Sequence, residues 1–353
     1  MRSNYLVRRR CAGVSLVELM IGMLIGMIAV IVMMQVFSVS EGFKRTTTGG
    51  DDAQNNGAIG LYGLRRDMQH SGHVAGMFPV VGCNIQLRAG VTLNTWAPVV
   101  INHASIPAGD ANTDTLVIVS GGGNGSMEGD RVEAQPAQTI YTVAAAVAAS
   151  GIGSISVGDN VVVQADPRPN PCTLTMEPVT ALAAANVTVG TGVAGMTGGI
   201  LYNLGPAPSV QVYAVRNGSL AVCDYMANDC SVAGNVNNAA IWMPIASNIV
   251  SLRAEYGSDG TVPMDGTVDA FSPVTPATAC AWARVSAIRV ALTARSAQYD
   301  KDNVTAAAPL WQGSASSPVV LTGFADWQHY RYKVFQTVVP LRNMAWQGAQ
   351  PSC

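Results

Sequence analysis

The sequence predicts an α+β protein in which a long N-terminal helix packs on an antiparallel β-sheet, with an additional β-rich lobe. Three observations lead to this fold class. An apolar run fills residues 13–34, a helical pattern continues to about residue 70, and short β-rich segments bounded by turn residues follow from residue 80 onward. Only 12% of the residues are charged, and small and β-branched residues are abundant, which is typical of a sheet-rich exported protein.

The apolar run is long enough to cross a membrane. It reads GVSLVELMIGMLIGMIAVIVMM over residues 13–34, and after Gly13 only Ser15 and Glu18 are polar. A helix needs roughly 20 apolar residues to span a bilayer. The preceding arginines at 8–10 should remain on the cytoplasmic side, which places the rest of the chain outside the cytoplasm.

Glu18 is the unusual residue of this run, because a carboxylate inside a membrane helix costs about 2.5–3.5 kcal/mol on insertion scales. Residues 13–19, GVSLVEL, resemble the processing site of type IV prepilins. The resemblance implies that prepilin peptidase cuts after Gly13 and methylates the new N-terminus at Val14. Valine departs from the commoner phenylalanine or methionine at this position. The resemblance also implies that Glu18 acts in assembly, where its negative charge is offset by the α-amino group of a neighbouring pilin.

Two other interpretations of the apolar run remain open. A secretory signal has an apolar region of 7 to 15 residues before small residues, which Ser38 and Ser40 could supply. A plain signal anchor is the second, and both leave Glu18 unexplained. Gly22 and Gly26 form a GxxxG pair, a spacing that lets membrane helices approach closely.

Charge argues against nucleic acid as a partner. Removal of residues 1–13 takes away four arginines, leaving 16 basic residues against 22 acidic ones and a net charge of −6. Such a chain has no general attraction to nucleic acid.

The cysteines predict disulfide bonds. Cys11 lies in the leader, and the other six can form three bridges in an oxidising compartment. Cys223 and Cys230 bracket a polar loop and are the pair favoured first. A zinc site is the alternative, but no CxxC spacing occurs. The six cysteines are Cys83, Cys172, Cys223, Cys230, Cys280 and Cys353.

The helix is expected to continue as an amphipathic segment over residues 38–72. A break is predicted at 46–50, TTTGG, because glycine costs about 1 kcal/mol relative to alanine inside a helix. Beyond it Leu61, Leu64 and Met68 recur at helical spacing. Gly72 is the expected C-terminal stop.

This helix end resembles that of the PilW family of large minor pilins. The family pattern is of the kind Q-x-N/G…L-x-R-D-x-R/Q-x-A/S-G. Matching residues are Gln54, Asn55, Asn56, Gly57, Leu64, Arg66, Asp67, Met68, Gln69, Ser71 and Gly72. No chemistry is assigned to them, and they are expected to end the helix and dock it.

The remaining chain is predicted to be β-rich. Residues 113–120 form a buried strand, and Asn217-Gly218 is a strong signal for a two-residue hairpin turn. The Gly/Ala-rich segment 121–205 forms a possible inserted β lobe. Further strands are expected at 249–257 and 284–295, and a last one at 330–342 closes the sheet.

The late segments also resemble the PilW family. The segments are IVSLRAEYGSDG, RVSAIRVALTARS and the terminal VVPLRNM. The expected organisation is therefore a leader peptide (1–13), a transmembrane helix (14–37), a periplasmic helix (38–72) and a β-rich pilin domain (73–353).

The resemblance implies a structural minor pilin, held in the inner membrane and then located at the pilus tip. It would take part in initiating pilus assembly. Its implied partners are prepilin peptidase, other minor pilins, the major pilin, inner-membrane lipid and a PilY-type tip adhesin. A J-type pseudopilin of type II secretion and a membrane-anchored adhesive protein are the alternatives.

No catalytic residue, metal or cofactor is predicted. The sequence has no Gly-x-Ser-x-Gly elbow, and no carboxylate pair stands out. Asp259, Asp265 and Asp269 lie in a glycine-bearing loop that lacks the spacing of an EF-hand, so calcium is the weaker hypothesis there. His70 and His73 are expected to be solvated at the helix end.

Overall fold

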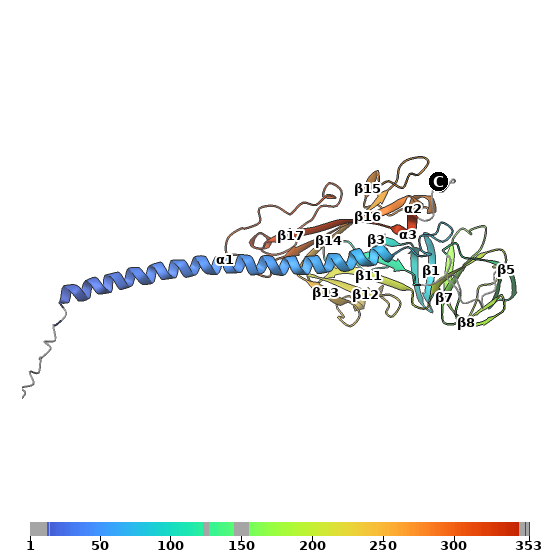
Figure 1. The fold of residues 1–353 in the computed structure, drawn as a ribbon, viewed down its shortest axis with the longest axis horizontal. Helices are drawn as coiled ribbons and strands as arrows, with labels where there is room; N and C mark the ends of the chain where they lie inside the picture. Colours follow the sequence, from blue (N-terminus) through green and yellow to red (C-terminus); the bar gives the residue numbers. More distant parts are fainter. Residues whose placement is uncertain (1–12, 14, 123–126, 145–154, 346–349, 351–352) are drawn as a thin grey trace, which may run out of the picture. The chain divides into compact units, whose positions relative to one another are not determined.

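The computed structural model describes residues 13, 15–122, 127–144, 155–345, 350 and 353, without the side chains of 43, 45–49 and 345. The chain divides into two units, 1–51 and 52–353, which are described separately. The leader, Val14 and Cys11 lie outside the described residues. Figure 1 shows the fold coloured along the sequence.

The first unit contains the beginning of helix α1 (Leu16–His70). Residues Leu16–Gly42 have a mean hydropathy of 2.6 in their most apolar window, and none of that window is buried. This segment is long and apolar enough to span a membrane. The predicted break at 46–50 was wrong, because these residues are helical. Glycine lowers the stability of a helix without forbidding its geometry.

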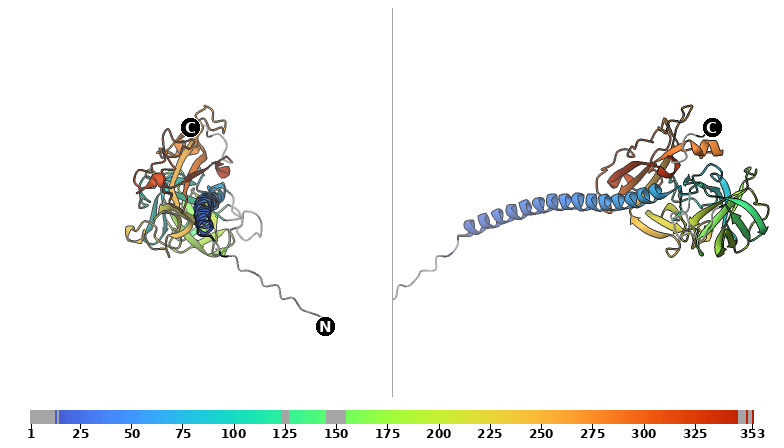
Figure 2. Two further views of the ribbon diagram at one scale, coloured as in Figure 1. Left: turned by 90° about the vertical axis from the view of Figure 1, so that its left-hand side faces the viewer. Right: turned by 45° about the vertical axis from the view of Figure 1, so that its right-hand side comes forward.

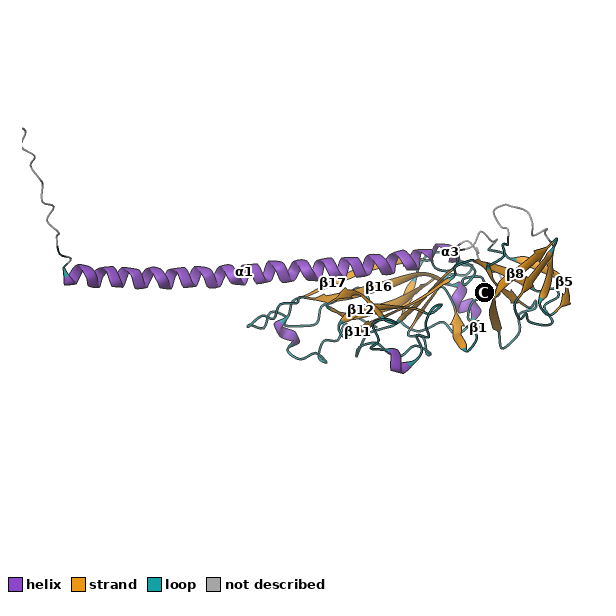
Figure 3. Ribbon diagram, turned by 90° about the horizontal axis from the view of Figure 1, so that it is seen from below, coloured by secondary structure: helices purple, strands orange, loops and turns teal. Residues whose placement is uncertain are grey.

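In the second unit, the last turns of α1 bury one stripe of small and apolar side chains. The buried residues are Ala53, Gly57, Gly60, Leu64 and Met68, spaced by three or four positions as on one face of a helix. This stripe belongs to the largest hydrophobic core of the molecule. Figure 3 shows this part of α1 beside strands of two sheets.

The first of these sheets has five antiparallel strands in the order β13-β12-β11-β4-β3. The predicted strand at 113–120 is confirmed as β4, which is buried in four of its five positions. The predicted hairpin is also confirmed, because Asn217 and Gly218 have φ of 51° and 69° and join β11 to β12. The strands are β3 (Val99–Ile101), β4 (Leu116–Ser120), β11 (Ser209–Arg216), β12 (Ser219–Asp224) and β13 (Met243–Ser247).

The second sheet has four antiparallel strands in the order β15-β14-β16-β17. All three strands predicted late in the chain are confirmed here, and the last one, β17, forms the edge. One face of the sheet contributes to the main core, and segment 296–331 covers the other with Trp311, Val319 and Leu321. The strands are β14 (Ile249–Ser258), β15 (Ala270–Ser272), β16 (Val285–Arg295) and β17 (Tyr332–Pro340).

The third sheet has eight strands, in the order β2-β1-β8-β7-β10-β5-β6-β9. An additional pairing of β8 with β9 closes six of them into a small barrel with its own core, which includes Val132, Tyr141 and Leu201. The strands are β1 (Cys83–Arg88), β2 (Val91–Trp96), β5 (Asp130–Ala137), β6 (Ile140–Val143), β7 (Asn160–Gln164), β8 (Thr173–Ala183), β9 (Asn186–Val189) and β10 (Ile200–Gly205).

The barrel strands come from the Gly/Ala-rich segment, which the sequence presented as a possible lobe. The hairpin of β1 and β2 is attached to the barrel by the parallel pairing of β1 with β8. Figure 2 shows these strands in green beyond the C-terminal end of α1. Short helices complete the fold: η1 (Ala233–Asn235), α2 (Ala279–Ala283), η2 (Trp327–His329) and α3 (Arg342–Ala345).

Candidate functional site

The predicted processing site, Gly13, lies shortly before α1. Gly13 is exposed, and apart from its chain neighbours no described atom lies within 4 Å of where a Cβ would be added. The Ser15 carbonyl accepts hydrogen bonds from the backbone N–H groups of Glu18 (3.0 Å) and Leu19 (3.1 Å), which begins the helix. Glu18 thus lies in the first turn of the helix, where the helix dipole favours a negative charge, and its side chain is exposed.

The glycine pair of the apolar segment lies on an open helix face. No described atom lies within 4 Å of the position that a Cβ would occupy on Gly22 or Gly26. Another helix can therefore approach this face closely. A packing role for the pair stays a prediction.

Two further glycines allow α1 to lie directly on the sheets of the second unit. A Cβ on Gly57 would lie 2.2 Å from the Phe335 ring of β17. A Cβ on Gly60 would lie 3.1 Å from Leu292 of β16 and 3.2 Å from Leu220 of β12. Gly57 belongs to the motif that was expected to dock the helix, and in the structure both glycines are contact points between the helix and the sheets.

Two polar residues of the PilW-like motif also contact the sheets. Lys333 Nζ of β17 donates to Gln54 Oε1 at 2.8 Å. The hydroxyl of Tyr213 on β11 donates to the Asp67 carboxylate, which also pairs with Arg66 at 3.0 Å. Burial, followed by the hydrogen bond to Asp67, raises the pKa of Tyr213. The tyrosine thus remains a donor throughout the physiological pH range.

The end of α1 is held by a residue from the other end of the chain. Asn343 Nδ2 of α3 donates to the Ser71 carbonyl at 2.7 Å and to the His70 carbonyl at 3.5 Å. The chain reverses at Gly72, with φ of +91°, and the Gly72 N–H donates to the Val119 carbonyl at 3.0 Å. The predicted stop at Gly72 is confirmed. The contact with Asn343 was not foreseen.

Asn343→Ala should lower the free energy of unfolding by about 1–2 kcal/mol, because it removes the donor that satisfies the last helix carbonyls. The measurement is urea unfolding of the full chain in detergent, with Arg342→Ala, an exposed neighbour, as the matched control. Equal unfolding midpoints for the two variants would contradict this role of Asn343.

An ion pair between adjacent strands joins two of the three late segments that resemble PilW. Glu255 of β14 lies opposite Arg289 of β16, and the Glu255 side chain is fully buried. Arg289 Nε donates to Glu255 Oε2 at 3.0 Å, and the Ser316 hydroxyl donates to Oε1. The guanidinium lies 4.1 Å from the centre of the Phe271 ring. This ion pair fixes the register of the two strands and the position of the covering segment.

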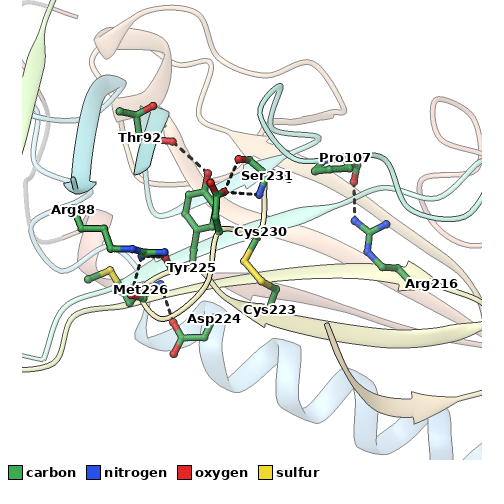
Figure 4. The surroundings of a disulfide bond; sticks show 11 residues. Arg88, Thr92, Pro107, Arg216, Cys223, Asp224, Tyr225, Met226, Cys230 and Ser231 are labelled. Atoms are coloured by element: carbon green, nitrogen blue, oxygen red, sulfur yellow. Dashed lines mark hydrogen bonds between the residues drawn. A yellow bond between two sulfur atoms is a disulfide. The ribbon is translucent and has the colours of Figure 1, made fainter. Parts of the chain in front are cut away.

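All six cysteines outside the leader form disulfide bonds in the structure. The pairs are Cys83–Cys172, Cys223–Cys230 and Cys280–Cys353. The first links β1 to the start of β8, and the third links α2 to the C-terminus. Around the second, Arg88 donates to the carbonyls of Tyr225 and Met226, as Figure 4 shows.

Mass spectrometry of the unreduced mature protein after thiol alkylation should therefore find no alkylated cysteine. Reduction before alkylation should label six, which serves as the control. Several labelled cysteines in the unreduced protein would contradict the three bridges.

The aspartate loop uses its carboxylates to organise its own backbone. Asp259 Oδ2 accepts from the N–H groups of Asp265 (2.8 Å) and Gly266 (2.7 Å), and Oδ1 accepts from Thr261. The Thr261 hydroxyl and then the loop N–H groups lower the pKa of Asp259. Within the described residues, no group of three His, Cys, Asp or Glu side chains could hold a metal ion.

The two histidines near the helix end have different surroundings. His70 is exposed, as expected, whereas His73 is partly buried and its Nε2 makes no hydrogen bond within the part of the chain that the structure describes. Burial lowers the pKa of His73. The expectation that His73 is solvated was wrong, because the segment after α1 turns back towards the core.

Comparison with known families matches both ends of the chain. The model of PilW, described as type IV pilus-assembly protein W, matches residues 212–343. The model of the prokaryotic N-terminal methylation motif matches residues 8–34. No curated protein and no solved structure matches the chain. The sequence resemblance is thus confirmed, and both families are components of pili rather than enzymes.

Proposed function

We propose that this chain, a type IV pilus minor pilin of the PilW family, takes part in initiating pilus assembly and remains in the tip complex. The supporting observation is the presence of both signals on one chain, a prepilin motif at 8–34 and a PilW domain at 212–343. A prepilin motif occurs on many pilus components, and the PilW domain indicates which kind of pilus component this chain is.

In this proposal the chain has two successive locations. Residues 14–37 hold the precursor in the inner membrane, where prepilin peptidase removes residues 1–13 and methylates Val14. The mature chain then leaves the membrane and joins other minor pilins and the major pilin. Support comes from the exposed Gly13 before α1 and from the apolar segment Leu16–Gly42.

The β-rich part of the chain is the proposed platform for partners. Helix residues 38–72 and the domain 73–353 would stand outside the membrane, with α1 fixed to the sheets through Gly57, Gly60 and Asp67. A PilY-type tip adhesin is the proposed partner at the tip, by analogy with the family.

Glu18→Ala tests the proposed function. The variant should be cleaved normally, yet it should fail to restore pili in a strain that lacks the gene. The reason is that Glu18 supplies the charge that offsets a neighbour's α-amino group in lipid. Pili are counted by electron microscopy, with Asp51→Ala, an exposed carboxylate in the same helix, as the control. Normal piliation by Glu18→Ala would exclude this role.

An adhesive role of the barrel is the second candidate, and it would act in addition to assembly. The barrel has its own core and lies outside the residues matched by the PilW model.

A deletion of residues 121–208 removes the barrel and tests this role. Ser120 at the end of β4 pairs with Ser209 at the start of β11, so a short turn can rejoin the chain there. Normal pilus numbers with lost attachment would favour adhesion, and lost pili would favour a role in assembly.

A further inference from the structure

A cavity of about 610 Å³ lies where the barrel meets the β1 strand and the Cys223–Cys230 loop. Its wall combines apolar side chains with one acidic and one basic group. The apolar part is formed by Leu87, Met176, Val193 and Met226, and the charged residues are Glu177 and Arg88. The openings of small barrels are frequent ligand sites.

The two charged residues are neighbours that do not pair. The parallel pairing of β1 with β8 ends at Gln86 and Thr175, and Arg88 and Glu177 each follow two residues later on their own strand. Both residues line the cavity. Among the described residues, however, no ion pair joins Arg88 to Glu177.

Each of these side chains is instead held by a different loop. Arg88 donates through Nη1 to the carbonyls of Tyr225 (2.6 Å) and Met226 (2.8 Å) in the disulfide loop (Figure 4). Glu177 Oε2 accepts from the Gly192 N–H at 2.7 Å. The positive and negative groups are therefore fixed on separate parts of the wall.

Both residues keep unused polar atoms at the cavity. Glu177 is only 6% exposed, and its Oε1 accepts no hydrogen bond from the described residues. Among the described residues, Arg88 donates hydrogen bonds through Nη1 alone, which leaves its Nε and Nη2 for a ligand. A buried carboxylate without a cationic partner is energetically costly, and a bound cation would reduce this cost.

We propose that this cavity binds a small zwitterionic ligand of the amino-acid class with an apolar side chain. The ligand's ammonium group binds Glu177 Oε1, and its carboxylate binds Arg88. The side chain contacts Val193 and Met226. A ligand with only one charge loses one of these interactions and meets the like charge on the opposite part of the wall.

The experiment measures the thermal unfolding of the full chain in detergent, with each of the twenty amino acids at about 10 mM, a concentration that detects millimolar affinity. At least one apolar amino acid should raise the midpoint. Two analogues of leucine, isoamylamine and 4-methylvalerate, each lack one charged group. If leucine binds, each should bind at least about tenfold more weakly, as determined by isothermal titration calorimetry.

Glu177→Gln should weaken binding of the same amino acid at least about tenfold. Glu133→Gln, the same change at an exposed position on the barrel, should bind like the unmutated chain. The absence of a shift with all twenty amino acids would overturn the proposal, as would equal binding of leucine and its single-charge analogues. Calorimetry on the unmutated chain decides the question if Glu177→Gln does not fold.

Discussion

Gly13→Leu is expected to leave all of the protein as the uncleaved precursor in the membrane. In the proposed processing the scissile bond follows Gly13, and a bulky side chain next to this bond would prevent the peptidase from accepting it. The structure makes this variant informative, because apart from its chain neighbours no described atom lies within 4 Å of a Cβ at Gly13. The added side chain therefore meets none of the described core residues.

The measurement is the mass of the protein isolated from membranes. The variant should retain residues 1–13 and lack N-methylation, whereas the unmutated protein should begin at Val14 with a methylated amino group. Gly22→Leu is the matched control, because it makes the same change at an exposed helix position away from the cleavage site. A normally processed Gly13→Leu protein would show that the cleavage site has been assigned incorrectly.

The consequence for assembly follows from the same chemistry. Without cleavage, Val14 carries a peptide bond instead of a free α-amino group. A neighbouring Glu18 then has no amino group to offset its charge in the lipid, where an isolated charge is costly. Gly13→Leu should therefore prevent incorporation of this subunit for a different reason from Glu18→Ala, whose product is cleaved.

The sequence predicted best those features that depend on neighbouring residues. The helix ends just before Gly72 because a glycine tolerates a φ of +91°, and the Asn217-Gly218 turn needs two residues with positive φ. Both requirements concern the backbone of the residue itself. The strands β14, β16 and β17 were also visible in the sequence, because they are long and rich in β-branched residues.

Features that depend on distant residues could not be derived from the sequence. Asn343 holds the carbonyl of Ser71 from 272 positions away, and the sequence carries no signal for such a contact. Closure of the barrel depends on the pairing of β8 with both β7 and β9, and the register of these pairs is set in three dimensions. The contact partners of Gly57 and Gly60 could not be foreseen, because they are in β12, β16 and β17.

Glu255→Ala is expected to cause the largest loss of stability, about 3–5 kcal/mol. The substitution leaves the Arg289 guanidinium, whose side chain is only 15% exposed, without its carboxylate, and an uncompensated charge that is largely buried is strongly destabilising. It also removes the acceptor of the Ser316 hydroxyl, which holds segment 296–331 over the sheet. A Cβ on Gly313 would lie 2.8 Å from Glu255 Oε2, so this segment approaches the carboxylate closely.

Denaturant unfolding of the full chain in detergent measures this loss, with tryptophan fluorescence as the signal, because Trp311 lies 5.5 Å from the Arg289 guanidinium. Asp300→Ala breaks the exposed pair of Asp300 and Arg331 and should cost at most about 1 kcal/mol. The double variant Glu255→Leu/Arg289→Met removes both charges and should recover most of the stability. If it is as unstable as Glu255→Ala, the loss comes from packing rather than from an unpaired charge.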